Sequence, residues 1–354
     1  MNRFEKVKQI LHNGTVIPAT PLALHADRSF DSQRQAALCR YYLDCGVGGI
    51  ATAVHTTQFE IRKPEYNLYR TVLKIMSDEI DTFEAKTGKS VIKVAGVCGK
   101  IPQAVSEANT AKELGFDCVL LSPGGLNDLS EDEMIERTKA VAAILPVIGF
   151  YLQPAAGGRI FTYSYWEKLC ACDNVVAIKC ASFNRYQTLD VMRAVALSPR
   201  SKEIAMYTGN DDNIVIDLLT PYKFVVDGKE YTSHFVGGLL GHWTVWTKKV
   251  VEMLDMLKEA AKKDSVPMEL LTLATHVTDM NAAVFDTAHR FAGCIPGVHE
   301  VLVRQGLMEG NWCLNPHEVL SEGQAEELTR VCKYYPDLVD DGYVKENLHK
   351  WLHA

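Results

Sequence analysis

The sequence predicts a (β/α)8 TIM barrel with a C-terminal helical extension. Two observations lead to this prediction. Short β-rich runs alternate with amphipathic stretches along most of the 354 residues, and eight such runs lie between residues 14 and 240. That number of strands over that length is typical of a barrel of this kind. The chain that follows is largely helical and is longer than the single helix that closes a barrel.

Each predicted strand is a short apolar or β-branched run bounded by glycine, proline or polar residues. In chain order we expect strands at residues 14–24, 49–57, 91–98, 118–122, 146–152, 175–180, 204–207 and 235–240. The helical stretches between them favour a parallel sheet.

The predicted helices show apolar stripes and end signals. After the first run, Asp31 is expected to cap a helix in which Leu38, Tyr41 and Tyr42 share one face, and Gly46 is expected to end it. Comparable stripes follow the next six runs, at residues 68–76, 104–114, 130–145, 162 onward, 189–195 and 214–219.

Two further segments set the domain organisation. Residues 222–233 carry Asp227-Gly228 between two β-rich pieces, which predicts a β-hairpin inserted before the last strand. Residues 243–354 are largely helical. We therefore expect a barrel catalytic domain over residues 1–242 and a helical extension over residues 243–354, packed on the barrel as a cap or an assembly surface.

A doubly wound open sheet is the alternative fold. It usually has fewer strands and a phosphate-binding loop after the first one. Here the first run ends in Thr20-Pro21-Leu22, with no G-x-G-x-x-G motif. The barrel is therefore the favoured prediction.

Composition excludes some classes of function. The net charge is −7, whereas nucleic-acid and anionic-membrane surfaces need clustered Lys and Arg. No apolar run approaches the roughly 18 residues of a membrane helix, and no secretory signal is visible. The ten Cys stand at irregular spacings typical of reduced core thiols rather than a zinc site. We expect a cytoplasmic protein without nucleic-acid or membrane partners.

Function in such barrels lies at the carboxyl ends of the strands. Lys179 ends the apolar run 175–178. Burial there disfavours the ammonium and frees an amine to attack a carbonyl, as in a Schiff-base lysine. Pairing with a carboxylate is the structural alternative. Tyr151 lies near the end of the preceding strand, where a phenol can pass protons or simply pack under a loop.

The second strand run ends in His55-Thr56-Thr57. Hydroxyl and amide groups at such a turn suit a carboxylate, although Thr is also a common strand residue. His55 can act as a base or be a structural histidine. Ser122 ends the fourth run, and its role is left open.

These sites in order resemble the dihydrodipicolinate synthase / N-acetylneuraminate lyase family of class I aldolases. The resemblance covers about residues 10 to 300. The matching motifs are Thr20-Pro21, Gly46-Val47-Gly48-Gly49-Ile50 with Thr56-Thr57, Tyr151 with Pro154, Ile178-Lys179 with Ala181, and Gly209-Asn210-Asp211.

The resemblance implies roles for these residues. Lys179 would form an imine with the substrate's 2-oxo carbon, Tyr151 would relay protons with the Thr56 hydroxyl, and Thr56 and Thr57 would hold the carboxylate. Gly237 would offer a backbone carbonyl. The resemblance further implies no metal or organic cofactor, and a homotetramer or homodimer.

The sequence departs from the family at several positions. His55 replaces a glycine, Ser122 lies where a second tyrosine is common, and Arg159 is out of register with an arginine of the synthase. We expect an atypical member rather than dihydrodipicolinate synthase itself. Ser122, water or His55 is a candidate for the proton relay, and Arg159 is a candidate to bind the distal end of a sugar-derived acid. His55, Ser122 and Gly209 are further substrate-binding candidates.

The favoured function is that of a lyase acting on a 2-oxo acid, pyruvate or a 2-oxo-3-deoxy sugar acid, as an aldolase or a dehydratase. A non-catalytic, regulatory metabolite-binding barrel is the second hypothesis. A metal enzyme using Asp211, Asp212 and His234 is the third, and no ligand spacing supports it.

Overall fold

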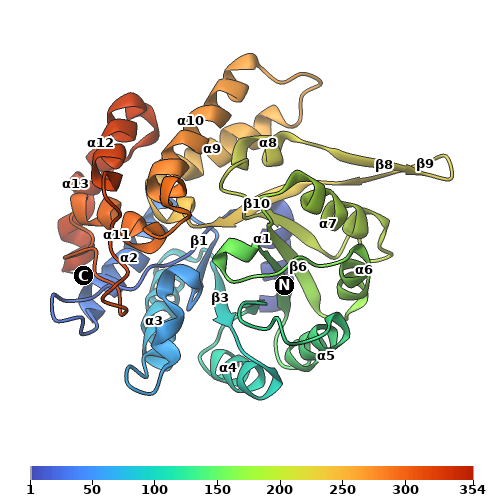
Figure 1. Cartoon of the computed structure of the whole chain (residues 1–354), viewed down its shortest axis with the longest axis horizontal. Helices are drawn as coiled ribbons and strands as arrows, with labels where there is room; N and C mark the ends of the chain where they lie inside the picture. Colours follow the sequence, from blue (N-terminus) through green and yellow to red (C-terminus); the bar gives the residue numbers. More distant parts are fainter. Residues whose placement is uncertain (1, 354) are drawn as a thin grey trace.

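The computed structural model describes residues 2–353, and it contains the predicted barrel. Eight parallel strands lie in the order β1-β10-β7-β6-β5-β4-β3-β2. Figure 1 shows helices arranged around them. A parallel bridge between Ala19 and Ala51 and a hydrogen bond from the Thr20 N–H to the Ala51 carbonyl (2.8 Å) join the two end strands. The strands are β1 (Val16–Pro18), β2 (Gly49–Thr52), β3 (Ile92–Val97), β4 (Cys118–Leu121), β5 (Val147–Leu152), β6 (Val175–Ala181), β7 (Ala205–Thr208) and β10 (Phe235–Leu240).

Helices surround this sheet in the alternation that the sequence predicts. They are α2 (Ser32–Cys45), α3 (Tyr69–Thr87), α4 (Ile101–Glu113), α5 (Glu131–Ala142), α6 (Tyr163–Ala171), α7 (Arg185–Leu197), α8 (Ile214–Leu219) and α9 (Thr247–Ala260). The expected end signals of α2 are confirmed: the Asp31 side chain accepts a hydrogen bond from the Arg34 N–H, and Gly46 adopts a left-handed conformation at the other end.

The first two predicted strands are much shorter in the structure, whereas the others differ by two residues at most. The first keeps only Val16–Pro18, since Pro18 and Pro21 have no N–H group to donate to a ladder. The second ends at Thr52, because Ala53 takes a positive φ of 62°. His55–Thr57 then form the 3-10 turn η1 rather than strand.

The predicted hairpin is confirmed as β8 (Tyr222–Val226) paired antiparallel with β9 (Lys229–Ser233). Both turn residues have positive φ, 49° for Asp227 and 74° for Gly228, as a two-residue hairpin turn of this type requires. The hairpin projects from the body of the molecule beside α7 (Figure 1).

Helix α1 (Arg3–Asn13) was not expected. Its Val7 and Leu11 pack with residues inside the barrel, and the Leu11 carbonyl accepts a hydrogen bond from the Tyr207 hydroxyl (3.0 Å). The helix therefore closes the end of the barrel opposite the carboxyl ends of the strands.

Four helices follow the barrel, and we call them the extension from here on. They are α10 (Met268–Val284), α11 (Cys294–Arg304), α12 (Gln324–Tyr334) and α13 (Asp341–Leu352). Helix α9 packs on α8, α2 and β1, so it occupies the last place in the ring of barrel helices. The expected boundary between barrel and extension, after residue 242, would assign α9 to the extension, although α9 packs as one of the barrel helices. Short 3-10 turns complete the chain: η2 (Phe59–Arg62), η3 (Pro154–Ala156), η4 (His242–Thr244), η5 (Thr287–His289) and η6 (Pro336–Leu338).

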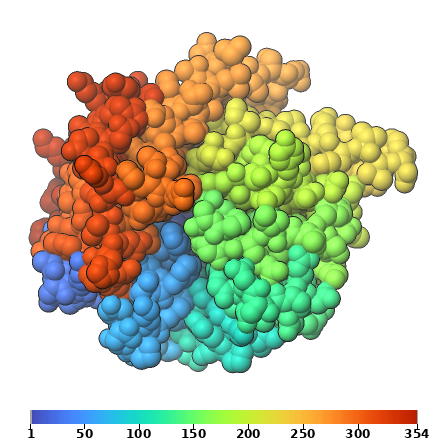
Figure 2. Space-filling model, in the orientation of Figure 1, coloured from blue at the N-terminus to red at the C-terminus, as the bar shows by residue number. Residues whose placement is uncertain are grey.

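The extension is tied to the turns at the carboxyl ends of two strands. Asn281 donates from Nδ2 to the Asp211 carbonyl (2.6 Å), and the Leu314 N–H donates to the Gln58 side chain (2.6 Å). The extension, drawn in orange and red, covers one side of the barrel (Figure 2). Within residues 2–353, no helix is both long enough and apolar enough to cross a membrane.

Candidate active site

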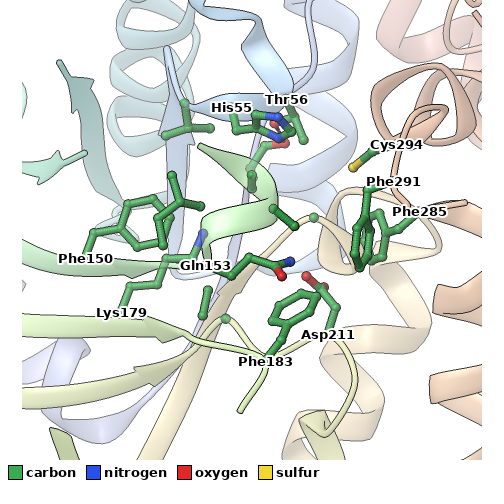
Figure 3. A pocket seen from close by; sticks show the side chains of 18 of the residues that line it. His55, Thr56, Phe150, Gln153, Lys179, Phe183, Asp211, Phe285, Phe291 and Cys294 are labelled. Carbon is green, nitrogen blue, oxygen red and sulfur yellow. Dashed lines mark hydrogen bonds between the residues drawn. The ribbon is translucent and has the colours of Figure 1, made fainter. Parts of the chain in front are cut away.

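A cavity of about 130 Å³ opens at the carboxyl ends of the strands, and its size suits a small molecule. Lys179, Asp211, His55 and Gln153 are the most polar side chains in it (Figure 3). Apolar groups make up most of the remaining wall: Ala19, Val54, Leu120, Phe150, Leu152, Ala155, Ala156, Ala181, Phe183, Phe285 and Phe291. Thr56, Gly209, Gly241 and Cys294 complete the lining.

Lys179 reaches this cavity from β6. Its neighbours Ile178 and Cys180 pack outward among the helices, whereas the alternation of the strand directs Lys179 inward. Gly209 makes room for it, because a Cβ at that position would lie 2.7 Å from the Lys179 Cε atom. The lysine is thus the one side-chain cation that lines the cavity among the described residues.

Lys179 and Asp211 influence each other electrostatically. Burial lowers the pKa of Lys179, and the negative charge of Asp211 partly opposes this change. Burial in turn raises the pKa of Asp211, while the charge of Lys179 opposes that rise. Asp211 also accepts a hydrogen bond from the His242 N–H (3.3 Å). The pKa of the Lys179 amine and the pKa of the Asp211 carboxyl group are thus both shifted towards neutral pH.

Tyr151, the expected proton relay, is not among the residues that line the cavity. Alternation along β5 turns Phe150 and Leu152 inward and Tyr151 outward. Its ring packs 5.0 Å from that of Trp166 and 5.9 Å from that of Phe161. Burial raises the pKa of Tyr151 to about 12, and its hydroxyl has no hydrogen-bond partner in the described chain.

Phe150 takes the place beside the lysine. It is paired with Lys179 in the register of β5 and β6, and the Lys179 Nζ lies 4.4 Å from its ring centroid. A hydrocarbon ring therefore lies beside the lysine, where the family resemblance implied a phenol.

Thr56 lines the cavity, but Thr57 does not. The Thr56 hydroxyl donates to the Ala19 carbonyl (2.6 Å) and the Thr57 hydroxyl donates to the Thr20 carbonyl (2.6 Å). Both hydroxyl protons therefore hold the turn against the end of β1. The hydroxyl protons are thus already used, whereas the amides that open the turn, those of His55 and Thr56, have no partner within it.

His55 lies in the cavity next to Thr56 (Figure 3). Burial and the nearby charge of Lys179 lower the pKa of His55 to about 4. The imidazole is therefore neutral at pH 7, and it offers a hydrogen bond rather than a positive charge.

Three further candidates lie away from the cavity. Ser122 is buried, and its hydroxyl accepts a hydrogen bond from the Gly124 N–H (3.2 Å). Arg159 donates to the carbonyls of Leu126 (3.4 Å) and Leu129 (2.5 Å), so it anchors a loop. Gly237 is packed against Thr15, near the opposite end of the barrel. Gly209 does line the cavity, and Gly241, not Gly237, is the glycine of the last strand-to-loop segment that lines it.

Asp211, Asp212 and His234, the residues of the metal hypothesis, do not lie together in the structure. Asp211 follows the carboxyl end of β7, whereas His234 precedes β10 and lies at the other end of the barrel with Asn13. In residues 2–353 the one group with metal-ligand spacing is His25, Asp31 and Glu309, and two of these three side chains are exposed.

Sequence reasoning missed much of the lining. Phe150 and Phe183 lie near or just after the carboxyl ends of their strands, as Lys179 does. They were not predicted as site residues, because an apolar side chain gives no sign of chemistry. Phe285, Phe291 and Cys294 come from the extension. No local pattern assigns them to the site.

Comparisons with known proteins agree with the fold. The family model described as the dihydrodipicolinate synthetase family matches residues 13–334. A 4-hydroxy-tetrahydrodipicolinate synthase of Clostridium novyi is 27% identical over 53% of this chain and 60% of its own length. One of Desulforudis audaxviator is 27% identical over 57% of this chain and 63% of its own length. The matched part of the chain spans about three fifths of these relatives.

Solved structures extend the similarity to almost the whole chain. A dihydrodipicolinate synthase from Oceanobacillus iheyensis superposes with a TM-score of 0.74 at 17% identity, covering 94% of this chain and 99% of that one. An N-acetylneuraminate lyase from Fusobacterium nucleatum gives a TM-score of 0.69 at 16% identity, covering 92% and 99%. At such identities the similarity concerns the fold.

Proposed function

Because this chain belongs to the dihydrodipicolinate synthetase family, whose members are lyases, we propose that it acts on a 2-oxo acid through an imine on Lys179. One observation carries the proposal: the partly buried Lys179 lies near the carboxyl end of β6, its side chain lines the cavity, and its pKa is lowered. A neutral amine attacks a carbonyl, whereas an ammonium does not.

The substrate carboxylate is bound at the turn His55–Thr57. The amides of His55 and Thr56 open this turn and donate to the carboxylate, while the two threonine hydroxyls hold the turn in place. The neutral His55 ring adds a hydrogen bond. This arrangement orients the 2-oxo carbon towards Lys179.

The chemistry then follows from the imine. The Lys179 nitrogen adds to the 2-oxo carbon, and the carbonyl oxygen leaves as water. The resulting iminium accepts electrons, so the neighbouring methyl carbon loses a proton and an enamine forms. The enamine carbon bonds to an aldehyde carbon, the aldehyde oxygen takes up a proton, and water releases the product and the free lysine. The reverse sequence cleaves the same carbon–carbon bond.

Asp211 is the group that we assign to proton transfer in these steps. Tyr151 and Ser122 lie outside the cavity, and His55 is a weak base there. Asp211 lies in the cavity, and its raised pKa brings it closer to neutrality, where a general acid–base group is most efficient.

The test is borohydride reduction in the presence of pyruvate, followed by intact-protein mass spectrometry and peptide mapping. Wild type is expected to gain one reduced pyruvate adduct on Lys179, and Lys179→Met is expected to gain none. Lys93→Met is the matched control, because Lys93 is also buried on a barrel strand but bonds to Ser77 (2.8 Å) and Asp81 (2.5 Å) outside the cavity. No adduct with pyruvate or with longer 2-oxo acids favours the non-catalytic, metabolite-binding barrel instead.

We further expect the chain to form a homodimer or homotetramer. Sedimentation at micromolar concentration measures this directly, and a single monomeric species contradicts it.

A further inference from the structure

Three phenylalanines form part of the cavity wall. Phe183 follows β6, and Phe285 and Phe291 come from the extension. Figure 3 shows these three rings grouped on the side of the cavity near Asp211. The rings of Phe183 and Phe291 meet edge to face, with centroids 6.0 Å apart. Part of the surface available to the distal end of a substrate bound on Lys179 is therefore aromatic.

Two of these rings are held by unusual backbone. Phe183 has a φ of 51° and Phe291 a φ of 69°, values that non-glycine residues rarely adopt and that cost free energy unless neighbouring bonds maintain them. The Phe183 N–H donates to the Asn210 side chain (3.0 Å), and the Phe291 N–H donates to the Asp286 carbonyl (2.9 Å).

The segment that carries Phe291 is fixed further by a buried carboxylate. Asp286 accepts hydrogen bonds from the Gly293 N–H (2.9 Å) and the Ser321 hydroxyl (2.5 Å), and it pairs with the His289 ring (2.6 Å). Strained backbone that is held this firmly is common at binding sites, because it presets the position of a side chain.

The polar groups of the cavity do not suit a charged or heavily hydroxylated distal group. Lys179 is used by the imine, and the guanidinium of Arg159 is bonded to loop carbonyls outside the cavity. Within the described chain no other side-chain cation lines the cavity to meet a second carboxylate, and the carboxyl group of Asp211 disfavours one. The Cys294 thiol beside the rings stays neutral, because burial raises its pKa well above the usual range. This leaves Asp211 and Gln153 for hydroxyl groups.

We propose that the reaction partner of the 2-oxo acid is an aldehyde with a flat apolar group, such as an aromatic ring, seated between Phe183, Phe285 and Phe291. This rests on the proposed imine chemistry. The enamine of pyruvate on Lys179 bonds to the aldehyde carbon, the aldehyde oxygen becomes a hydroxyl, and hydrolysis of the iminium releases a 4-hydroxy-2-oxo acid with the apolar group on C4. The reaction has no oxidant or reductant, and the reverse direction cleaves that acid to pyruvate and the aldehyde.

The test compares three aldehydes with pyruvate: benzaldehyde, glyceraldehyde and succinic semialdehyde, which carry an aromatic ring, hydroxyl groups and a carboxylate. For wild type we expect kcat/KM for benzaldehyde to exceed the other two by at least about tenfold, the usual scale of discrimination by an apolar pocket. Phe291→Ala is expected to lower kcat/KM for benzaldehyde about 10- to 100-fold, and Phe291→Leu less than that. Tyr186→Ala, a change at an aromatic residue that is 83% exposed, is the control and leaves it unchanged.

The pyruvate adduct separates this inference from the proposed function. Both Phe291 variants should still trap pyruvate on Lys179, which shows that they fold and form the imine. If wild type traps pyruvate but uses glyceraldehyde or succinic semialdehyde as well as benzaldehyde, or uses none of the three, the inference is overturned and the imine chemistry stands. If wild type traps no 2-oxo acid, the proposed function itself fails.

Discussion

The Nζ atom of Lys179 lies 4.4 Å from the centroid of the Phe150 ring, and the two residues are paired in the register of β5 and β6. An ammonium over an aromatic face gains about 0.5–2 kcal/mol from the quadrupole of the ring. Phe150 therefore favours the charged form of Lys179, while burial disfavours it. The lysine meets a hydrocarbon ring at the place where a phenol would serve proton transfer.

Phe150→Leu tests this contact. Leucine keeps the apolar surroundings but removes the aromatic face, so the ammonium loses stabilisation and the pKa of Lys179 falls further. The rate of pyruvate trapping should then persist to lower pH than in wild type. The measurement is the initial rate of borohydride-trapped adduct as a function of pH. An unchanged profile, or one moved to higher pH, contradicts the contact as described.

Asp211→Asn should change both the rate and its pH dependence. Loss of a general acid–base group typically lowers kcat about 10²- to 10⁴-fold. The substitution also removes the negative charge that supports the protonated lysine. The pKa of Lys179 therefore falls, and its amine becomes available at lower pH.

The matched control for this change is Asp212→Asn, at the exposed neighbouring residue, which is not part of the cavity lining. It should keep kcat within about threefold of wild type, because the Asp212 side chain is exposed and does not line the cavity. Steady-state rates and trapping rates across pH 5–9 give both readouts. Equal losses in the two variants would show that the turn, not the Asp211 carboxyl group, matters.

Tyr151→Phe should leave activity nearly unchanged. The Tyr151 ring packs on Trp166 and does not line the cavity, and its hydroxyl has no hydrogen-bond partner in the described residues. Removing a buried, unpaired polar group is neutral or stabilising by about 1–3 kcal/mol. We expect kcat/KM within about twofold of wild type and an equal or higher Tm. A 100-fold lower kcat/KM in a folded variant would instead indicate that the phenol takes part in catalysis.

Asp217 should be a main determinant of stability near the site. Its side chain is fully buried, pairs with Arg185 (2.5 Å) and accepts hydrogen bonds from Thr208 (2.7 Å) and Asn210 (2.8 Å). Leaving the buried hydrogen-bond donors without this partner costs about 1–3 kcal/mol, and the pair with Arg185, whose side chain is 39% exposed, adds little. Asp217→Ala should lower the free energy of unfolding by about that amount in urea titrations.

The comparison for this loss is Asp190→Ala, which breaks a largely exposed pair with Arg193 (3.1 Å). Exposed pairs contribute about 0–1 kcal/mol. If the two variants lose the same stability, the buried network around Asp217 is less important than its geometry indicates. Because Asn210 also accepts the Phe183 N–H, the Asp217 variant should in addition weaken benzaldehyde use.

The sequence by itself determined the fold and the central lysine. Periodic apolar runs are local, and a parallel barrel follows from eight of them separated by helices. A lysine at the end of the apolar run 175–178 is equally local, and the structure places it in the cavity. The hairpin turn at Asp227-Gly228 was readable for the same reason, since two residues carry its backbone requirement.

The tertiary structure alone decided which neighbours meet Lys179. Side chains alternate across a strand, so a difference of one residue turns Tyr151 outward and Phe150 inward, and a motif read in one dimension does not resolve that step. Phe285 and Phe291 lie more than a hundred residues beyond Lys179 and reach the cavity because the extension packs on the turn at Asp211 through Asn281. Contacts of this kind depend on how helices dock in space, and no local pattern in the sequence records them.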